Sequence, residues 1–331
     1  MANIFGTNGN DTLLGSKGAD TINGKAGNDT ITGGGGKDKF IYDFYGGIGP
    51  SIITDFGGIG KGVNPSAAVI AEVDTLEFQE YDSFTAQNLL LTQNGNNLEI
   101  TFAEGADAYY SGLAVAKVIL QNFALENLDN LSKSTGATVD LGNILFYGQT
   151  STTDSFDVFN ADSTQSTIFN LNTVTFLNDL NNNVNGFDNS DDVINGEGGN
   201  DKIDGKSGND LLRGGTGNDT LIGGAGNDTL VGGIGNSNSL NIDYSSGDNL
   251  LDGGDGNDSL SVSGNYENVF AGDVYFASGN NTLNGGAGND TLNISYSKGD
   301  NLLNGDDGND FLFASSNDYN ISNTITSGNN T

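Results

Sequence analysis

Single apolar residues recur along two stretches of the chain, each inside a polar phrase of nine residues. In residues 214–230, which read GGTGNDTLIGGAGNDTL, Leu221 and Leu230 each stand two places after an Asp. One apolar residue flanked by polar ones fits a short strand with a single inward side chain and is too short for a helix. The predicted inward residues are Leu13, Ile22, Ile31, Phe40, Ile203, Leu212, Leu221 and Leu230.

The polar part of each unit reads G-x-x-G-x-D. Glycine at the first and fourth positions permits positive φ and close approach of backbone segments, and Asp is a common turn residue. A nine-residue turn and strand reverses the chain each time, so eighteen residues form one coil. Tandem units in strict register therefore predict an all-β fold, a parallel β-roll or β-solenoid.

Aspartates one coil apart are expected to stack on the same edge of such a roll. The predicted pairs are Asp11 with Asp29, Asp20 with Asp38, Asp201 with Asp219 and Asp210 with Asp228. Stacked carboxylates repel each other unless a cation lies between them, and 11 Lys and Arg face 43 Asp and Glu. Carboxylates and loop carbonyls are the ligands that Ca²⁺ prefers, so the pattern predicts calcium sites.

The repeated phrase resembles G-G-x-G-x-D-x-U-x, the nonapeptide of RTX (hemolysin-type) calcium-binding proteins, over roughly residues 4–41 and 192–310. The resemblance implies a parallel β-roll with Ca²⁺ between each stacked pair of loops, held by Asp side chains and backbone carbonyls. The alternative is a metal-free solenoid with Gly-Asn-Asp turns. The candidate metal-binding residues are Asp11, Asp20, Asp29, Asp38, Asp201, Asp210, Asp219, Asp228, Asp258, Asp290 and Asp310, with Gly9, Gly18, Gly27, Gly36, Gly199, Gly208, Gly217 and Gly226.

We expect four regions: a short roll (1–41), a β-rich capping domain (42–135), an irregular β connector (136–190) and a second roll (191–331). In the capping domain, Asn94-Gly95 predicts a hairpin within residues 89–102, and residues 117–123 read as a strand. Residues 124–131 fit a short helical turn. For Asp43, Asp55 and Asp74 a solvated position on the outer face of a strand is favoured over a further cation site.

A longer repeat takes over in the second roll, where residues 239–251 match 291–303 at an offset of 52. Asn238 stands one residue later than the nine-residue spacing after Asp228 requires. Asp290 and Asp310 are twenty apart and can still share a cation, whereas Asp258 has no partner at eighteen, which leaves its site doubtful. Residues 327–331 restart 278–282, so we expect the array to continue beyond residue 331. The aromatic residues of this region favour core packing over a ligand platform: Tyr244, Tyr266, Phe270, Tyr275, Phe276 and Tyr296.

Composition excludes several functions. Without His or Cys, catalytic triads, thiol nucleophiles and disulfides are excluded, and no convincing catalytic constellation remains. A net charge of −32 opposes both nucleic acid binding and metal-free compaction, so we expect folding to be coupled to Ca²⁺. The N-terminus lacks the features of a Sec signal, and no apolar run is long enough for a membrane span. The resemblance implies type I secretion and an extracellular or cell-surface location.

Three functional hypotheses follow. The first is a secreted, calcium-folded structural or adhesive repeat protein, acting as a spacer or cell-surface matrix element. The second is a non-catalytic part of a larger secreted toxin or polysaccharide-active enzyme, with the central domain or the aromatic region binding glycan. The third, ice binding by a flat Thr/Asn face, is the weakest because the third loop position varies among Lys, Ser, Thr, Ala and Ile.

Overall fold

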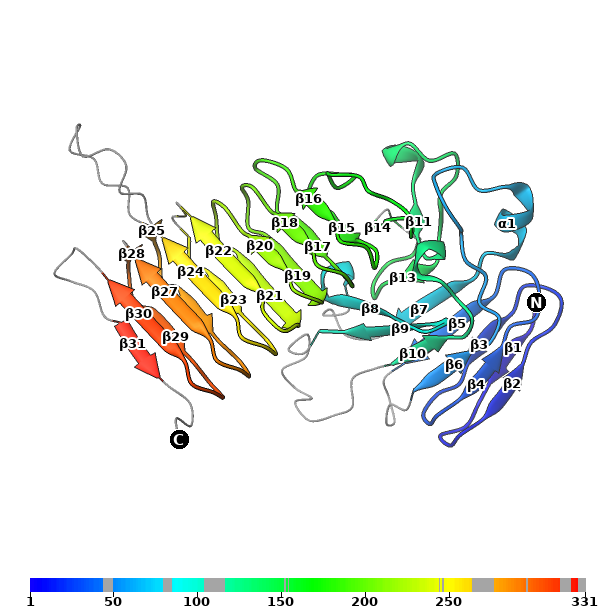
Figure 1. Ribbon diagram of the computed structural model, residues 1–331. Coiled ribbons are helices and arrows are strands. Elements are labelled where there is room, and N and C mark those ends of the chain that lie inside the picture. The colour runs from blue at the N-terminus through cyan, green and yellow to red at the C-terminus, as the bar shows by residue number, and fades with distance from the viewer. Residues whose placement is uncertain are drawn as a thin grey trace. The chain divides into compact units, whose positions relative to one another are not determined.

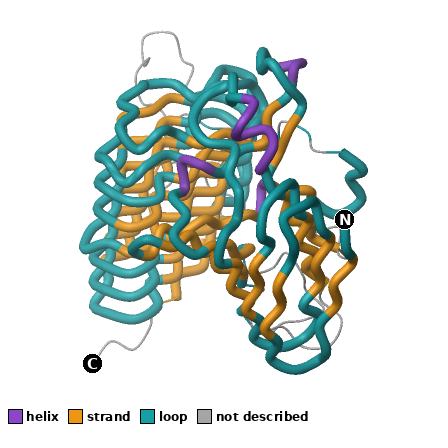
Figure 2. The backbone as a smooth tube through the Cα atoms, turned by 90° about the vertical axis from the view of Figure 1, so that its right-hand side faces the viewer, coloured by secondary structure: helices purple, strands orange, loops and turns teal. Residues whose placement is uncertain are grey.

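The computed structural model describes residues 1–43, 50–79, 85–103, 117–151, 153, 155–243, 245, 247–263, 277–295, 297–315 and 323–326. The chain forms two compact units, residues 1–158 and 159–331. Each is built mainly from short parallel strands that lie side by side (Figure 1) and stack as successive rungs (Figure 2). The prediction of an all-β fold with parallel β-rolls is therefore confirmed.

The first unit contains one parallel sheet, one mixed sheet and an antiparallel pair of β11 (Asn130–Leu131) and β12 (Leu141–Gly142). The parallel sheet has the order β1 (Asn3–Phe5), β3 (Thr21–Asn23), β5 (Lys39–Asp43), β7 (Thr75–Gln79) and β13 (Ile144–Leu145). The mixed sheet has the order β2 (Thr12–Leu14), β4 (Thr30–Thr32), β6 (Ser51–Ile53), β10 (Val118–Leu120), β9 (Asn97–Phe102) and β8 (Leu89–Asn94). Since β6 and β7 come from the predicted capping domain yet pair in parallel with β4 and β5, the roll continues past the repeats.

The non-repetitive segments of this unit agree with the sequence in three places and differ in one, and the strand predicted within residues 117–123 is β10. Strands β8 and β9 pair antiparallel around Asn94-Gly95, which confirms the hairpin, and the helical turn is the 3₁₀ helix η2 (Leu125–Asn127). Sequence analysis missed α1 (Ala67–Glu72), which begins where the Ser66 hydroxyl accepts a hydrogen bond from the Val69 N–H at 3.3 Å. The remaining elements are η1 (Ala86–Asn88), η3 (Lys133–Thr135) and β14 (Phe156–Val158).

The second unit has two long parallel sheets. In one, the strands follow the order β15 (Val174–Phe176), β17 (Val193–Asn195), β19 (Leu211–Thr216), β21 (Thr229–Ile234), β23 (Leu250–Asp252), β26 (Thr282–Asn284), β29 (Asn301–Asn304) and β31 (Asn323–Thr326). In the other, the order is β16 (Asn183–Asn185), β18 (Lys202–Asp204), β20 (Thr220–Ile222), β22 (Ser239–Asp243), β24 (Ser259–Ser263), β27 (Thr291–Ser295) and β30 (Phe311–Ser315). A separate pair joins β25 (Ala277–Ser278) to β28 (Ser297–Lys298).

Successive coils stack with the same inward residues in register. Leu212 pairs with Ile194 on one side and Leu230 on the other, and all three are fully buried. The predicted inward residues are buried in both units, except Leu13 in β2, the outermost strand of its sheet, which is half-buried. Strands β15 and β16 pair with β17 and β18, so the coil starts upstream of the first regular repeat.

Helix contributes little to either unit. In the described part of the chain α1 is six residues long. None of the helices there has the length and the apolar character needed to cross a membrane.

Candidate metal sites

The loop aspartates form a ladder along the edges of each roll. The backbone N–H of a loop Asp donates to the Oδ1 atom of the residue at the same loop position one coil further along, which is an Asp in most loops. The four predicted pairs lie together in this way, with N–Oδ1 distances of 2.9 Å (Asp11–Asp29), 2.7 Å (Asp20–Asp38), 2.8 Å (Asp201–Asp219) and 3.0 Å (Asp210–Asp228). Register between strands thus places carboxylates of successive coils against each other.

We name the two edges of the second roll by their loops. Edge I carries the loops that end at Asp201, Asp219, Asn238, Asp258, Asp290 and Asp310, and edge II those that end at Asp192, Asp210, Asp228, Asn249, Asn281 and Asn301.

The ladder on edge I passes through Asp258. The Asn238 N–H donates to Asp258 Oδ1 at 2.6 Å, and the Asp258 N–H donates to Asp290 Oδ1 at 2.8 Å. Asp258 therefore has a stacked partner despite the missing Asp at a spacing of eighteen, and its cation site stays a prediction. Strand pairing sets the stacking, and Leu260 still pairs with Leu292 although a longer connection separates them.

The second carboxylate oxygen of most ladder aspartates is buried without a partner. A buried carboxylate oxygen without a hydrogen bond or a cation is costly, and native structures rarely keep one. Among the described residues, the Oδ2 atoms in this condition belong to Asp29, Asp201, Asp210, Asp219, Asp228, Asp258, Asp290 and Asp310. A cation beside these oxygens would supply the missing partner.

Each of these oxygens faces a cradle at the first glycine of its loop. A methyl group placed on Gly196 would lie 2.5 Å from Asp201 Oδ2 and 2.3 Å from the carbonyl oxygen of Gly214 in the next coil. A methyl group on Gly285 would likewise lie 2.5 Å from Asp290 Oδ2 and 2.9 Å from the Gly305 carbonyl oxygen. At these two glycines, carboxylate and carbonyl oxygens of neighbouring coils converge where no side chain fits.

This donor set suits a hard cation. Within the described residues no three acidic side chains gather around one point. A cation would therefore take its remaining ligands from backbone carbonyls, as Ca²⁺ commonly does. The residues present fit the metal that the sequence predicts, although which of them bind it stays a prediction.

Loop glycines have two different structural roles. Positive φ occurs at the second and fourth positions, as at Gly215 (φ 97°) and Gly217 (φ 127°). The expectation of positive φ at the first position is therefore wrong, because that glycine is needed for close approach instead. A methyl group on Gly217 would lie 1.6 Å from the Gly199 carbonyl oxygen, so contact between coils also requires glycine at the fourth position.

Burial shifts the acidity of the ladder. Desolvation raises the pKa of Asp201 and of Asp210 to about 8, and neighbouring carboxylates raise it further. Desolvation also raises the pKa of Asp228 and of Asp258 to about 6. Without a cation, these side chains favour the protonated form near or below neutral pH.

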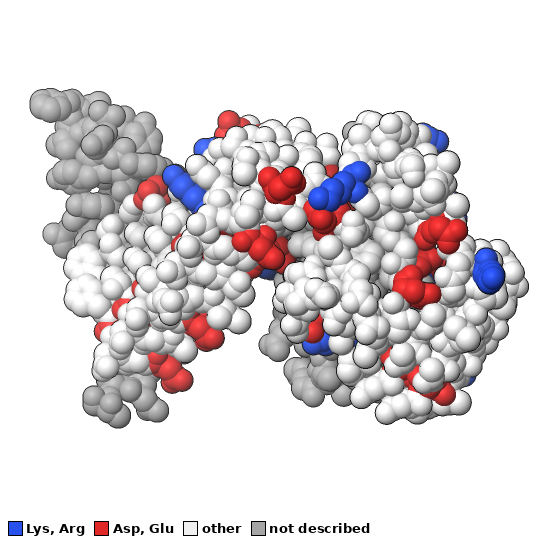
Figure 3. Space-filling model, turned by 45° about the vertical axis from the view of Figure 1, so that its right-hand side comes forward, with Lys and Arg blue, Asp and Glu red and all other residues white. Residues whose placement is uncertain are grey.

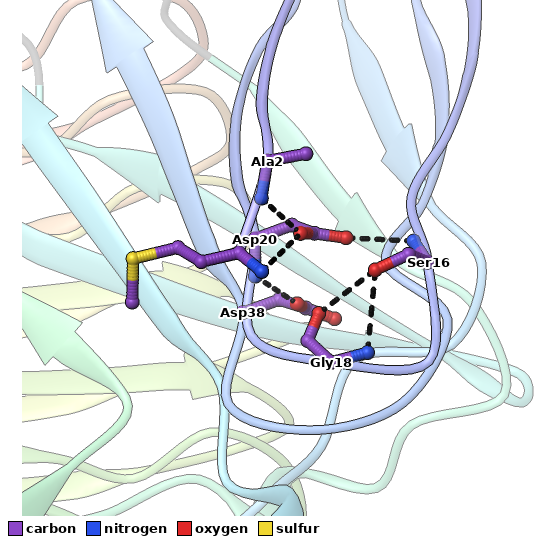
Figure 4. Close-up of polar contacts among 6 residues, drawn as sticks. Ala2, Ser16, Gly18, Asp20 and Asp38 are labelled. Atoms are coloured by element: carbon purple, nitrogen blue, oxygen red, sulfur yellow. Dashed lines mark hydrogen bonds and ion pairs between the residues drawn. The ribbon is translucent and has the colours of Figure 1, made fainter.

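The carboxylates at the start of the first roll are bonded differently. Asp11 Oδ2 accepts the Thr7 N–H at 2.6 Å, and Asp20 Oδ2 accepts the Ser16 N–H at 2.6 Å (Figure 4). Hydrogen bonds from Ser16 lower the pKa of Asp20. Backbone donors thus already stabilise these charges, and the predicted cation role of Asp11 and Asp20 stays a prediction.

Asp74 continues the ladder of the first roll. The Asp38 N–H donates to Asp74 Oδ1 and the Gly57 N–H donates to Asp74 Oδ2, both at 2.7 Å. Asp74 is 3% exposed, and desolvation raises its pKa to about 7, so the solvent-facing interpretation is wrong for this residue. Asp55 is exposed and accepts from the N–H groups of Gly33 and Gly34. The Asp43 side chain lies outside the described residues.

A second ladder, made by the Asn at the fifth loop position, was missed by sequence analysis. The Asn28 N–H donates to Asn10 Oδ1 at 2.9 Å, and the Asn218 N–H donates to Asn200 Oδ1 at 2.8 Å. These bonds point back to the preceding coil, opposite to the Asp ladder. The recurrence of Asn before most loop aspartates was the available signal, but Asn is also an ordinary turn residue.

A comparison with protein-family models identifies the same repeats. A profile of the RTX calcium-binding nonapeptide repeat (4 copies) matches residues 5–40, 188–212, 204–237, 245–264, 277–293 and 297–319. The chain is an RTX-type β-roll repeat protein. Its repeats are of a calcium-binding type.

One solved structure with similarity is the extracellular lipase LipA from Serratia marcescens. It is 17% identical, the match covers 77% of this chain and 33% of the lipase, and the TM-score is 0.21. The RTX-type chain therefore spans about a third of that lipase. A search of curated proteins finds no match. The aromatic residues weighed as a glycan platform, from Tyr244 to Tyr296, lie outside the described residues.

Proposed function

We propose that this RTX-type protein is an extracellular structural element whose rolls fold around Ca²⁺. The observation that carries the proposal is the column of buried Oδ2 atoms without hydrogen-bond partners. Because each column runs along the stacking direction, ions bound there would join one coil to the next.

The proposed ligands are the ladder carboxylates with the loop carbonyls beside them. Bound Ca²⁺ would neutralise paired carboxylates and supply the attraction between coils. On edge I the carboxylates are Asp201, Asp219, Asp258, Asp290 and Asp310, on edge II they are Asp210 and Asp228, and in the first unit they are Asp29 and Asp38 with their partners Asp11 and Asp20.

Net charge supports coupling between folding and metal. At −32 the chain repels itself, and only 11 basic residues oppose that charge. Figure 3 shows one face on which acidic side chains lie in small separate groups among uncharged atoms. The ladder carboxylates are buried, so solvent screens their repulsion poorly. Removal of Ca²⁺ is therefore expected to expand the chain.

An extracellular role follows from the affinity expected of such sites. Carboxylate and carbonyl sites in extracellular modules bind Ca²⁺ at roughly 10⁻⁴–10⁻³ M. Such sites would fill outside a cell and empty inside it, which fits folding after type I secretion. A roll without His or Cys suits a spacer or surface-matrix element better than a catalyst.

The experiment is a Ca²⁺ titration of the full chain from chelator to about 10 mM, followed by far-UV circular dichroism and hydrodynamic radius. We expect a cooperative collapse to a β-rich particle that Mg²⁺ reproduces poorly. Asp219→Asn should raise the Ca²⁺ concentration at the midpoint. Asp162→Asn, which removes the same charge at an exposed position, should not. A chain already compact and β-rich in chelator at pH 8 would refute the proposal.

A further inference from the structure

The residue type at the ladder position of edge II changes after Asp228. From there on, the ladder position holds asparagine in every coil that the structure describes: Asn249, Asn281 and Asn301. The Asp228 N–H donates to Asn249 Oδ1 at 2.9 Å, so asparagine takes the acceptor place of the next aspartate. All three asparagines are buried.

Hydrogen bonds on both sides fix the orientation of these amides. Asn249 Oδ1 must accept from the Asp228 N–H, so Nδ2 points the other way. It donates to the Gly247 carbonyl at 3.0 Å and to Asn281 Oδ1 at 2.9 Å. Asn281 Nδ2 in turn donates to Asn301 Oδ1 at 2.9 Å. A bonded N–H donor therefore stands where edge I presents an unpartnered oxygen.

Apolar side chains replace the glycine cradle on the same edge. In the short coils the loop begins with Gly directly after the strand. Strands β22, β24 and β27 instead run two residues further and bury a second side chain: Ile242, Val262 and Ile294. These three pair in register from coil to coil. A column of hydrocarbon thus occupies the inner side of edge II.

The boundary between the two arrangements lies at Gly223. A methyl group on Gly223 would lie 2.3 Å from Ile242 Cδ1, whereas one on Gly214 of edge I would lie 2.6 Å from the Gly232 carbonyl oxygen. Hydrocarbon therefore stands where a carbonyl oxygen would complete a cation site. A cation cannot replace its hydration shell with a methyl group and an amide N–H.

We infer that edge II binds no cation from Asn249 onward, where an asparagine ladder and an apolar column hold the coils together instead. Edge I keeps its Asp258, Asp290 and Asp310 sites, so this half of the roll is metal-bound on one edge only. The inference rests on the proposed calcium role of the edge I loops.

Asn238 on edge I provides the matched comparison. Its Nδ2 donates to the Gly253 carbonyl oxygen at 3.2 Å, so it lacks the ligand oxygen of an aspartate. Its loop nevertheless keeps Gly232 and Gly233, and no apolar side chain enters the cradle of Gly232. Asn238→Asp would complete an oxygen cradle, whereas Asn249→Asp would set a carboxylate oxygen against the Asn281 oxygen in place of an N–H donor.

The test measures Ca²⁺ bound per full-length chain by equilibrium dialysis at saturating Ca²⁺. Asn238→Asp should bind more Ca²⁺ than the unaltered chain, and Asn249→Asp should not. A second pair of variants, Asp290→Asn and Asn281→Ser, removes a carboxylate from edge I and an amide from edge II. This pair does not depend on whether Asn249→Asp folds. Asp290→Asn should lower the bound Ca²⁺, and Asn281→Ser should leave it unchanged.

The outcomes separate this inference from the proposed function. A gain of Ca²⁺ in Asn249→Asp equal to that in Asn238→Asp, or a loss in Asn281→Ser, would overturn the metal-free edge. Failure of the unaltered chain to bind Ca²⁺ at all would instead overturn the calcium role of the rolls.

Discussion

Acid should replace Ca²⁺ as the agent that folds the second roll. The perturbation is a pH change from 8.5 to 5 in chelator, where no metal neutralises the ladder. Burial raises the pKa of Asp201 and of Asp210 to about 8 in the folded roll, against an ordinary value of 3.8. Stability from a raised pKa is fully present below the ordinary value and is lost as pH rises through the folded value.

The size of the effect follows from this window. Between pH 4 and 8, each of the two side chains takes up about one proton on folding, which changes the folding equilibrium about tenfold per pH unit. Together they contribute about a hundredfold per pH unit. Exposed carboxylates titrate near pH 4 and add little above pH 6. The slope between pH 6 and 8 therefore reports buried carboxylates, and burial also raises the pKa of Glu197, so the part that belongs to Asp201 and Asp210 is the part lost when they are replaced.

The assay follows circular dichroism and hydrodynamic radius against pH in chelator, stopping above the sequence pI of about 4.1 to limit precipitation. We expect a β-rich, compact state to appear as pH falls. The double variant Asp201→Asn, Asp210→Asn should lose about two protons of this dependence. A slope that persists unchanged in the double variant, or a chain whose compactness ignores pH, would refute the reasoning.

Three further substitutions test the stacking in saturating Ca²⁺ by urea unfolding. Gly226→Ala adds a methyl group 1.7 Å from the Gly208 carbonyl oxygen, at a φ of 140°. It should lower the free energy of unfolding by well over the ~1 kcal/mol of backbone strain expected for Gly60→Ala, where the methyl group meets open space. Equal losses in the two variants would contradict the contact between coils. Leu221→Ala, fully buried in the inner column, should cost about 2–5 kcal/mol, and a cost below 1 kcal/mol would contradict the packing. Asn130→Ala removes two buried hydrogen bonds to the backbone of β13 and should cost about 2 kcal/mol, whereas no change would mean that water replaces them.

The parts of the fold that obey a short period could be predicted from the sequence. Positions such as Ile203 and Leu212 recur every nine residues, so one strand geometry explains them all. Prediction failed where residues that stack in three dimensions are not separated by the regular spacing in the sequence. Asp74 joins the ladder 36 residues after Asp38, and Asp258 meets its neighbour after 32. Neither spacing reveals the contact, because loops of different length can close on the same strand register.

The residue at a ladder position also indicates whether a cation can bind there only once the neighbouring strands are known. Asn249 and Asn238 both occupy the ladder position that Asp holds in other loops. Their surroundings differ because the position before the Asn249 loop is filled by the buried Ile242, whereas glycine, Gly232, occupies it before the Asn238 loop. Which asparagine lies in an oxygen-lined site depends on neighbours in adjacent coils, and the local phrase does not contain that information.

The offset of 52 residues has a consequence for how such a chain can lengthen. Leu240 pairs with Leu260 and Leu260 with Leu292, so 52 residues advance the chain by two complete coils. Copying one block in the gene would therefore insert whole coils and return every later strand to its former neighbours. With parallel strands about 4.8 Å apart, each copy would add about 10 Å of reach. Length can thus change in fixed steps by unequal recombination, without any new packing solution.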